Sequence, residues 1–308
     1  MRIAVMGAGS IGGYFGGMLS QGGNEVTLIA RGAHLDAIRS NGLQIITDDN
    51  EFIVECRATD YPGQVGPVDL VLLTVKTYHN QEAIPAMVEM LSPNTTVLCL
   101  QNGIDSFEAA ARCHGAEKVL PGAAYIDVSL EGPGVVRQIG KDVEIVFGEP
   151  DGVDSPRCES ISATFRKAGI PAQLSNNIQR TLWTKFLYIA TTAGVMSLSR
   201  QTMDQLLPLP EWRRVIMGCM EEISAVGLAS GVDLNQNIVQ DTIEYIEGAL
   251  EEMHASMHAD ILAGRPLELE ALNGAVVRAG ISAGVPTPIN DVIYAALKPF
   301  ASGSQHLL

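Results

Sequence analysis

Short apolar runs alternate with helical stretches through residues 1–175, a pattern typical of an α/β domain. The runs 69–75 and 96–100 are rich in leucine and valine, as in strands that a parallel sheet buries on both faces. A Gly-Pro-Gly turn at 132–134 separates later strands, which we expect to extend the sheet in an antiparallel direction. The predicted strands are 2–6, 25–30, 43–46, 51–55, 69–75, 96–100, 118–121, 124–129, 134–139, 143–147 and 171–174.

After Asn177 the pattern changes to long helical periods. Gly231 and Gly264 stand where helix C-terminal caps belong, and Pro288 suits a first helical turn. We therefore predict the α/β class, with a Rossmann-type doubly wound sheet domain over 1–175 and an all-helical domain over 176–308. The predicted helices of the second domain are 178–200, 211–231, 235–263, 267–284 and 288–300.

The first predicted strand runs directly into a G-x-G-x-x-G motif that opens a helix. In this position the motif is the fingerprint of a dinucleotide site. We expect Gly7 to make the tight turn, Gly9 to let the backbone approach a pyrophosphate, and Gly12 to let the helix pack on the strand. A structural turn without a ligand is the alternative. The predicted cofactor contacts here are Gly7, Ala8, Gly9, Ser10, Ile11 and Gly12.

The residue after the second predicted strand bears on the choice of cofactor. An NAD site usually has a carboxylate at this point, but here Ala30, Arg31 and Gly32 follow the strand. A guanidinium suits a 2′-phosphate because it is planar, always charged and able to bind two oxygens. We predict NADP(H) as the cofactor, with a solvated surface arginine as the alternative for Arg31.

Composition and charge narrow the function classes. The chain of 308 residues has 46% hydrophobic and 18% charged residues, as in ordinary globular proteins. Its net charge of −15 argues against nucleic acid or an anionic membrane as a partner, and it has no long uncharged apolar run that would span a membrane. The five scattered cysteines indicate neither a disulfide framework nor a metal site. Because the first strand leaves no room for a signal peptide, we expect a cytoplasmic protein.

Polar side chains follow two of the predicted buried strands. Lys76 comes after 69–75 and Asn102 after 96–100, and the carboxyl ends of parallel strands face the ligand crevice. Lys76 is expected to reach a cofactor phosphate or ribose, and a solvated lysine is its alternative. Asn102 offers a donor and an acceptor to a ribose or a substrate oxygen, although Asn-Gly is also a plain turn signal.

The helical half of the chain contains a lysine that is surrounded in the sequence by large apolar residues. Lys185 is flanked by Trp183 and Phe186, and burial lowers the pKa of a lysine and suits it to donate a proton. The alternative is a lysine that snorkels over an apolar groove. Ser256 shares a predicted helix face with Asp260, four residues further on. Glu268 follows a Gly-Arg-Pro turn at the predicted start of a helix, where a carboxylate often only stabilises the helix dipole.

Taken in order, these residues resemble the ketopantoate reductase (2-dehydropantoate 2-reductase) family. The resemblance covers nearly the whole chain, through the glycine motif, Arg31, Val75-Lys76, Gln101-Asn102-Gly103, Leu182-Trp183-x-Lys185, Leu267-Glu268 and Asn273-Gly274. It implies NADPH-dependent reduction of a small-molecule 2-oxo acid to a 2-hydroxy acid, as in pantothenate biosynthesis. It leaves a homodimer open as the assembly.

By position in the family motifs, the resemblance implies Lys185 as the catalytic proton donor and Glu268 as a carboxylate that bridges the active site and the cofactor ribose. It implies Asn102 and Ser256 as substrate contacts. The cofactor contacts that it implies, besides the glycine motif, are Arg31, Lys76, Asn102, Val128 and Glu268.

Two positions depart from the family pattern. Where the family usually has asparagines one and two helical turns beyond the lysine, this chain has Ile189 and Ala193. Without those polar groups the site loses a means of selecting a substrate hydroxyl, which favours a bulkier and more apolar 2-oxo acid. Two other functions stay open: a 3-hydroxyacid dehydrogenase of the hydroxyisobutyrate type, and a non-catalytic NADPH-sensing module.

Overall fold

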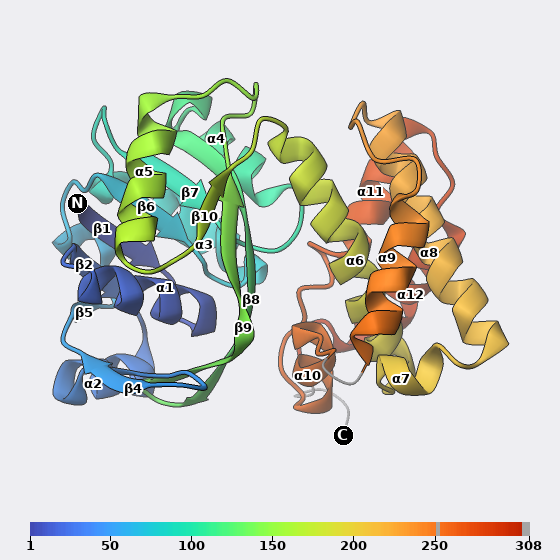
Figure 1. Ribbon diagram of the computed structural model, residues 1–308, viewed down its shortest axis with the longest axis horizontal. Helices are drawn as coiled ribbons and strands as arrows, with labels where there is room; N and C mark the ends of the chain where they lie inside the picture. The colour runs from blue at the N-terminus through green and yellow to red at the C-terminus, as the bar shows by residue number, and fades with distance from the viewer. Residues whose placement is uncertain (251–252, 304–308) are drawn as a thin grey trace. The chain divides into compact units, whose positions relative to one another are not determined.

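A computed structural model describes residues 1–250 and 253–303 of the chain (Figure 1). The contacts between its residues divide the chain into two compact units. Unit 1 contains Met1–Gln101 and Ser106–Ile178, and unit 2 contains Asn102–Asp105 and Gln179–Leu308. A short loop about one third of the way along the sequence therefore belongs to the second unit.

Unit 1 is built on a sheet of ten strands in the order β4-β3-β9-β8-β7-β6-β1-β2-β5, with β10 paired to β9. Adjacent strands are parallel along the series β8, β7, β6, β1, β2 and β5. Ile3 of β1 lies opposite both Val26 of β2 and Leu70 of β6. The strands are β1 Arg2–Met6, β2 Glu25–Ile29, β3 Leu43–Ile46, β4 Glu51–Val54, β5 Arg57–Thr59, β6 Leu70–Leu73, β7 Thr96–Cys99, β8 Val119–Gly132, β9 Val135–Phe147 and β10 Ala172–Leu174.

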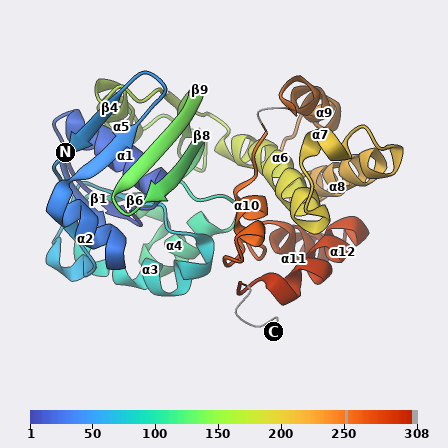
Figure 2. The same ribbon diagram turned by 90° about the horizontal axis from the view of Figure 1, so that it is seen from below.

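Helices cover both faces of this sheet, which explains why its central strands are apolar throughout. Along β1, Ile3 and Val5 pack with α1, α2 and α5, whereas Ala4 and Met6 pack with α3 and α4. Figure 2 shows α1 and α5 on one side of the strands and α3 and α4 on the other. The helices are α1 Ser10–Gln21, α2 Gly32–Asn41, α3 Asn80–Ala86, α4 Ser106–His114 and α5 Pro156–Lys167, with single 3-10 turns η1 Pro62–Gln64, η2 Thr77–His79, η3 Val88–Met90 and η4 Ala116–Lys118.

The predicted fold class is confirmed, but some strand bounds were wrong. The four strands predicted between 118 and 147 are two long antiparallel strands, β8 and β9, which form the hairpin in Figure 2. The pairing continues across a bulge near Tyr125 and Asp127, so the interrupted apolar pattern does not end the strands. β5 was not predicted from the sequence, because its three residues Arg57–Thr59 form no apolar run.

Unit 2 is entirely helical in its described residues. Its apolar core contains Trp183 and Phe186 of α6, Ile216 and Ile223 of α8, and Val276 of α11. The helices are α6 Ile178–Ser199, α7 Met203–Leu206, α8 Pro210–Ala229, α9 Ile238–Gly248, α10 Ser256–Leu262, α11 Asn273–Ala283 and α12 Pro288–Leu297, followed by the 3-10 turn η6 Lys298–Phe300.

Two predicted helices were too long. The helix predicted over 235–263 is divided into α9 and α10, since α9 ends at Gly248 and Ala255 is extended; residues 251–252 lie outside the described part. The helix predicted over 267–284 begins only at Asn273, so Glu268 lies before α11 and not in a first helical turn. Gly248 stands at the first break, and no Gly or Pro follows it before Gly264.

In residues 1–250 and 253–303, no helix has both the length and the apolar character needed to cross a membrane. The same residues contain no group of three or more His, Cys, Asp or Glu side chains placed to hold a metal ion. All five cysteines are free thiols.

Packing at the glycine motif provides a first prediction. A Cβ atom on Gly12 would lie 2.5 Å from Thr74 Oγ1 and 2.8 Å from Val5 Cγ1, whereas a Cβ atom on Gly9 would meet nothing within 4 Å. Gly12→Ala should therefore lower the free energy of unfolding of unit 1 by about 1–3 kcal/mol through overpacking. The matched variant Gly9→Ala should unfold as the parent does. Urea denaturation measures both, and equal stability of the two variants would contradict this packing.

Candidate active site

The glycine motif is held in an open, ligand-accessible form at the carboxyl end of β1. Gly7 has φ +106° and lies too close to Val75 for any side chain, so the chain turns there. Thr74 Oγ1 donates to the Gly7 carbonyl at 2.8 Å, which ties the turn to the end of β6. Gly9 is the N-cap of α1, and no side chain caps it. The unpaired N–H groups of the first turn and the open space at Gly9 suit a phosphate group.

His34 supports this loop, and sequence analysis missed it. Its Nδ1 accepts a hydrogen bond from the Gly134 N–H at 3.0 Å, so in the neutral ring the proton is on Nε2. Nε2 donates to the Ala8 carbonyl at 2.7 Å. The β8–β9 hairpin, α2 and the glycine motif are thus linked through one imidazole. A histidine outside any motif gives no sequence signal for such a role.

Two basic residues lie at the carboxyl ends of β2 and β6, the strands on either side of β1. Arg31 is the extended N-cap of α2, directly after β2, and its exposed guanidinium lies 3.5 Å from the Glu82 carboxylate on α3. Ion pairs this exposed contribute little stability, so the guanidinium can exchange partners at small cost. Lys76 is half-buried and begins the 3-10 turn after β6. Val128 is half-buried in β8, opposite Gln138 of β9.

Unit 2 brings together three of the predicted site residues. Lys185 lies on α6 and its Nζ donates to Asn102 Oδ1 at 3.1 Å. Burial lowers the pKa of Lys185 to about 8, while the Glu268 carboxylate acts in the opposite direction. Glu268 itself is only 6% exposed. A lysine of this kind is still largely protonated at neutral pH and can release its proton readily.

Ser256 and Asp260 lie one helical turn apart on α10. Ser256 is the exposed first residue of α10. Asp260 is buried, and its carboxylate accepts from Arg265 Nε at 2.7 Å, which makes it part of a structural ion pair. Ile189 and Ala193 follow Lys185 on α6 and pack with the apolar core of unit 2.

The loop Asn102–Asp105 is fixed against the segment that carries Glu268. Gly103, at φ +100°, approaches the Ala271 carbonyl so closely that a Cβ atom would lie 2.8 Å from it. Arg278 of α11 forms ion pairs with Asp105 and with Glu270, each at 3.1 Å. These contacts explain why a loop from the first third of the chain meets a lysine on α6. Arg278 was not predicted from the sequence, since one exposed arginine on a helix has no distinguishing pattern.

Gln101, the residue before this loop, is anchored within unit 1. Its Nε2 donates to the Val75 carbonyl at 2.6 Å and to Asn80 Oδ1 at 2.7 Å. Asn80 in turn donates to Ser106 Oγ at 3.1 Å. The Gln-Asn-Gly motif thus has one residue that fixes the backbone and one that faces Lys185.

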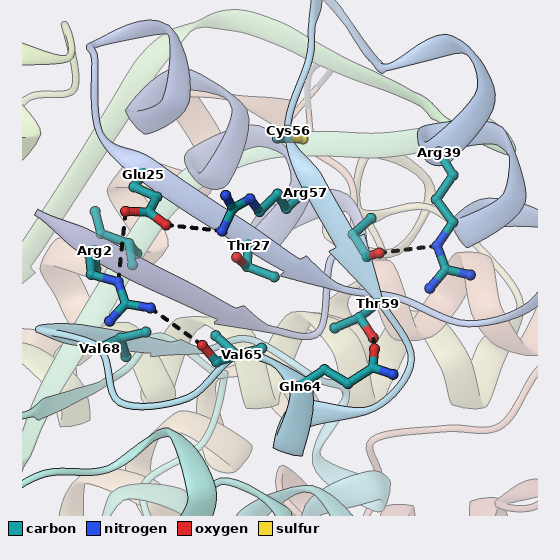
Figure 3. A pocket seen from close by; sticks show the side chains of 12 residues that line it. Arg2, Glu25, Thr27, Arg39, Cys56, Arg57, Thr59, Gln64, Val65 and Val68 are labelled. Carbon is teal, nitrogen blue, oxygen red and sulfur yellow. Dashed lines mark hydrogen bonds and ion pairs between the residues drawn. The ribbon is translucent and has the colours of Figure 1, made fainter.

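A surface cavity of about 390 Å³ in unit 1 lies at the opposite end of the strands from the glycine motif (Figure 3). It is lined by the starts of β1, β2 and β5, including Arg2, Arg39 and Arg57. Arg57 pairs with Glu25 at 3.1 Å, Arg2 donates to the Pro67 carbonyl at 2.8 Å, and Arg39 donates to the Ala58 carbonyl at 3.1 Å. Because these guanidiniums hold carboxylates and carbonyls, we interpret the cavity as a structural ion-pair cluster.

Comparison with known proteins agrees with this arrangement. The family described as "Ketopantoate reductase PanE/ApbA" matches residues 3–152, and "Ketopantoate reductase PanE/ApbA C terminal" matches residues 177–301. A 2-dehydropantoate 2-reductase from Mesorhizobium japonicum is 29% identical and covers 98% of both chains. The chain belongs to the ketopantoate reductase family, a family of oxidoreductases that act on a CH–OH group.

Solved structures show the same fold. A PanE/ApbA family ketopantoate reductase from Ralstonia eutropha JMP134 superposes with a TM-score of 0.91, is 31% identical and covers 98% of each chain. A 2-dehydropantoate 2-reductase from Geobacter metallireducens GS-15 has a TM-score of 0.91 and 30% identity, covering 97% of this chain and 99% of that one. A D-mandelate dehydrogenase in a ternary structure with NADH and anilino(oxo)acetate has a TM-score of 0.89 and 25% identity, covering 98% of each chain.

The charge state of Lys185 provides a second prediction. Amine labelling at a series of pH values, followed by mass spectrometry of the Lys185 peptide, should show an apparent pKa of about 8. Because the Glu268 carboxylate raises the pKa of Lys185, Glu268→Gln should move the labelling midpoint to lower pH. Glu270→Gln is the control: its carboxylate is paired with Arg278 and Lys298, so the midpoint should stay in place. A midpoint near that of an ordinary lysine would contradict the burial of Nζ.

Proposed function

We propose that this protein is an NADPH-dependent reductase that converts a 2-oxo acid into the 2-hydroxy acid. The observation that carries the proposal is the Lys185 ammonium, 3.1 Å from Asn102 Oδ1, with a pKa lowered to about 8, in a chain of the ketopantoate reductase family. A nicotinamide cofactor supplies hydride to the C2 carbonyl when it is bound. The protein's own groups then have to bind the carboxylate substrate, polarise its carbonyl and deliver one proton.

Lys185 is suited to the last two of these tasks. Negative charge develops on the carbonyl oxygen as its carbon accepts hydride, and an adjacent ammonium stabilises that charge and then transfers its proton. Asn102 holds Nζ in place through its side-chain oxygen, which leaves its amide N–H groups for a substrate or ribose oxygen. Glu268 keeps a larger fraction of Lys185 protonated at neutral pH than burial alone would allow. We assign substrate contact to Ser256 as well.

Cofactor binding is assigned to residues of unit 1 and, by its position in the family motif, to Glu268. The open first turn of α1 would receive the pyrophosphate, with Lys76, Val128 and Glu268 as further contacts. Arg31 would bind the 2′-phosphate that distinguishes NADPH from NADH, since its guanidinium is exposed and so is the Glu82 carboxylate with which it pairs.

Lys185→Ala tests the reaction itself. Loss of a general acid typically lowers kcat by about 10²–10⁴-fold, and NADPH affinity should change little. In the parent, the rate of 2-oxo acid reduction should fall as pH rises through about 8, because Lys185 loses its proton there. Lys167→Ala, an exposed lysine at the end of α5, is the control and should keep the parent kcat. A Lys185→Ala enzyme within about threefold of the parent would exclude the catalytic role.

Arg31→Ala tests the choice of cofactor. Charge-assisted hydrogen bonds contribute about 1.5–3 kcal/mol, so the variant should bind NADPH about ten- to a hundredfold more weakly while NADH binding is nearly unchanged. Glu82→Gln should strengthen NADPH binding, since it removes the carboxylate that competes with a phosphate. Arg57→Ala, another exposed arginine of unit 1, should affect neither cofactor. If Arg31→Ala weakens the binding of NADPH and NADH equally, Arg31 does not bind the 2′-phosphate.

A panel of 2-oxo acids tests the substrate. Ile189 and Ala193 present apolar side chains on the lysine helix, and a relative of known structure binds anilino(oxo)acetate, an acid with a bulky aromatic group. We therefore expect higher kcat/KM for a 2-oxo acid with a large apolar side chain than for ketopantoate. If ketopantoate has the highest kcat/KM of the panel, the specificity proposal fails and the reductase proposal stands. If no 2-oxo acid is reduced although NADPH binds, the NADPH-sensing alternative is favoured.

A further inference from the structure

A buried chain of polar side chains connects four helices of unit 2. Asn273, the first residue of α11, has no exposed surface, and neither has Asn290 of α12. Asn273 Nδ2 donates to Asn290 Oδ1 at 3.0 Å and to the Ala190 carbonyl of α6 at 3.2 Å. Asn290 Nδ2 donates to the Glu222 carboxylate of α8 at 2.8 Å. A polar network this deep in an apolar core is costly unless its geometry serves a purpose.

One end of this network is the helix that carries Lys185. Ala190, whose carbonyl accepts from Asn273, is five residues beyond Lys185 on α6. The Asn273 side chain approaches α6 so closely that a Cβ atom on Gly194 would lie 2.7 Å from Asn273 Oδ1. A glycine inside a helix weakens it, so Gly194 is best explained by the space that the Asn273 amide requires.

The other end is the segment that carries Glu268. The Leu272 N–H donates to the Glu268 carbonyl at 3.1 Å, and the Gly274 N–H donates to the Leu269 carbonyl at 2.9 Å. These bonds make a tight turn that leads directly into Asn273. The same turn receives the loop of Asn102, because Gly103 packs against Ala271 within it.

The Asn273 amide is not fully satisfied by this arrangement. Its Oδ1 is buried and has no hydrogen-bond partner within residues 1–250 and 253–303. A core residue selected only for stability would be expected to satisfy both ends of its amide or to be apolar. The bond to α6 is retained in spite of that cost.

We propose that Asn273 is a positioning residue for the reaction: by fixing α6 to the 268–272 turn, it sets the placement of the Lys185 ammonium relative to the Glu268 carboxylate and Asn102. The inference rests on the proposed function for its kinetic consequences only. Its structural consequence, the environment of Lys185, is measured independently of any substrate.

Two variants and one matched control test it. Asn273→Ala removes the bond to α6, and Gly194→Ala keeps every donor but pushes α6 away from the Asn273 amide. Gly248→Ala is the control, since it also replaces a glycine in a helix but its Cβ atom would meet nothing within 4 Å. We expect both variants to lower kcat by about ten- to a hundredfold with NADPH affinity within about twofold of the parent. The control should have the parent kcat and equal or greater thermal stability.

The pH dependence of Lys185 labelling separates positioning from simple destabilisation. If Lys185 moves away from Glu268, it loses the influence that raises its pKa, so the labelling midpoint should fall below about 8 in both variants. Gly194→Ala should also have a smaller effect in the Asn273→Ala background than in the parent, because the atom with which it collides is gone.

The outcomes are distinct. A lower Tm in both variants, with the parent kcat and labelling midpoint, would show that Asn273 only stabilises the core and would overturn the inference. If Asn273→Ala does not fold, Gly194→Ala decides by the same measurements. If the parent reduces no 2-oxo acid, the proposed function fails, and the labelling midpoints alone still decide whether Asn273 positions Lys185.

Discussion

Partial burial of the Lys185 ammonium is the constraint on which the arrangement of unit 2 depends. A buried cation is stable only where an acceptor and a negative charge are held close to it. Asn102 supplies the acceptor and Glu268 the charge, and neither is near Lys185 in the sequence. The fold therefore has to bring a loop, a turn and a helix to one point and keep them there. The balance of burial and opposite charge leaves a proton that is held at neutral pH yet readily transferred.

The parts of the fold that were predicted correctly are those with a local signal. The glycine motif lies between an apolar strand and a helix, and its three glycines have the turn, the open space and the close packing that the motif requires. The two-part architecture follows from a change of hydrophobic period near Asn177. Lys185, Asn102 and Glu268 were predicted as site residues from their order and context. The structure places Lys185 Nζ on Asn102 and under the influence of the Glu268 charge, and the roles of the three residues stay predictions.

What the sequence did not predict depends on contacts that no local pattern encodes. Glu268 was expected in a first helical turn. Hydrogen bonds to its carbonyl and to the Leu269 carbonyl instead form a separate turn, and α11 begins after it, at Asn273. His34 fixes the glycine motif through Ala8 and Gly134, which lie 26 and 100 residues from it along the chain. These roles arise from tertiary packing, so neither residue type nor spacing indicates them.

The loop Asn102–Asp105 has a consequence for how such proteins can be recombined. Because it belongs to unit 2 while its neighbours in sequence belong to unit 1, the chain passes between the units at three places. A chimera joined near Ile178 would combine the helices of one parent with the loop of another. The loop's Gly103 would then have to pack against a turn from the other parent at position 271. Its Asp105 would have to pair with the other parent's residue at position 278. The helical half can therefore be exchanged between homologues with its contacts preserved only if these four loop residues are exchanged together with it.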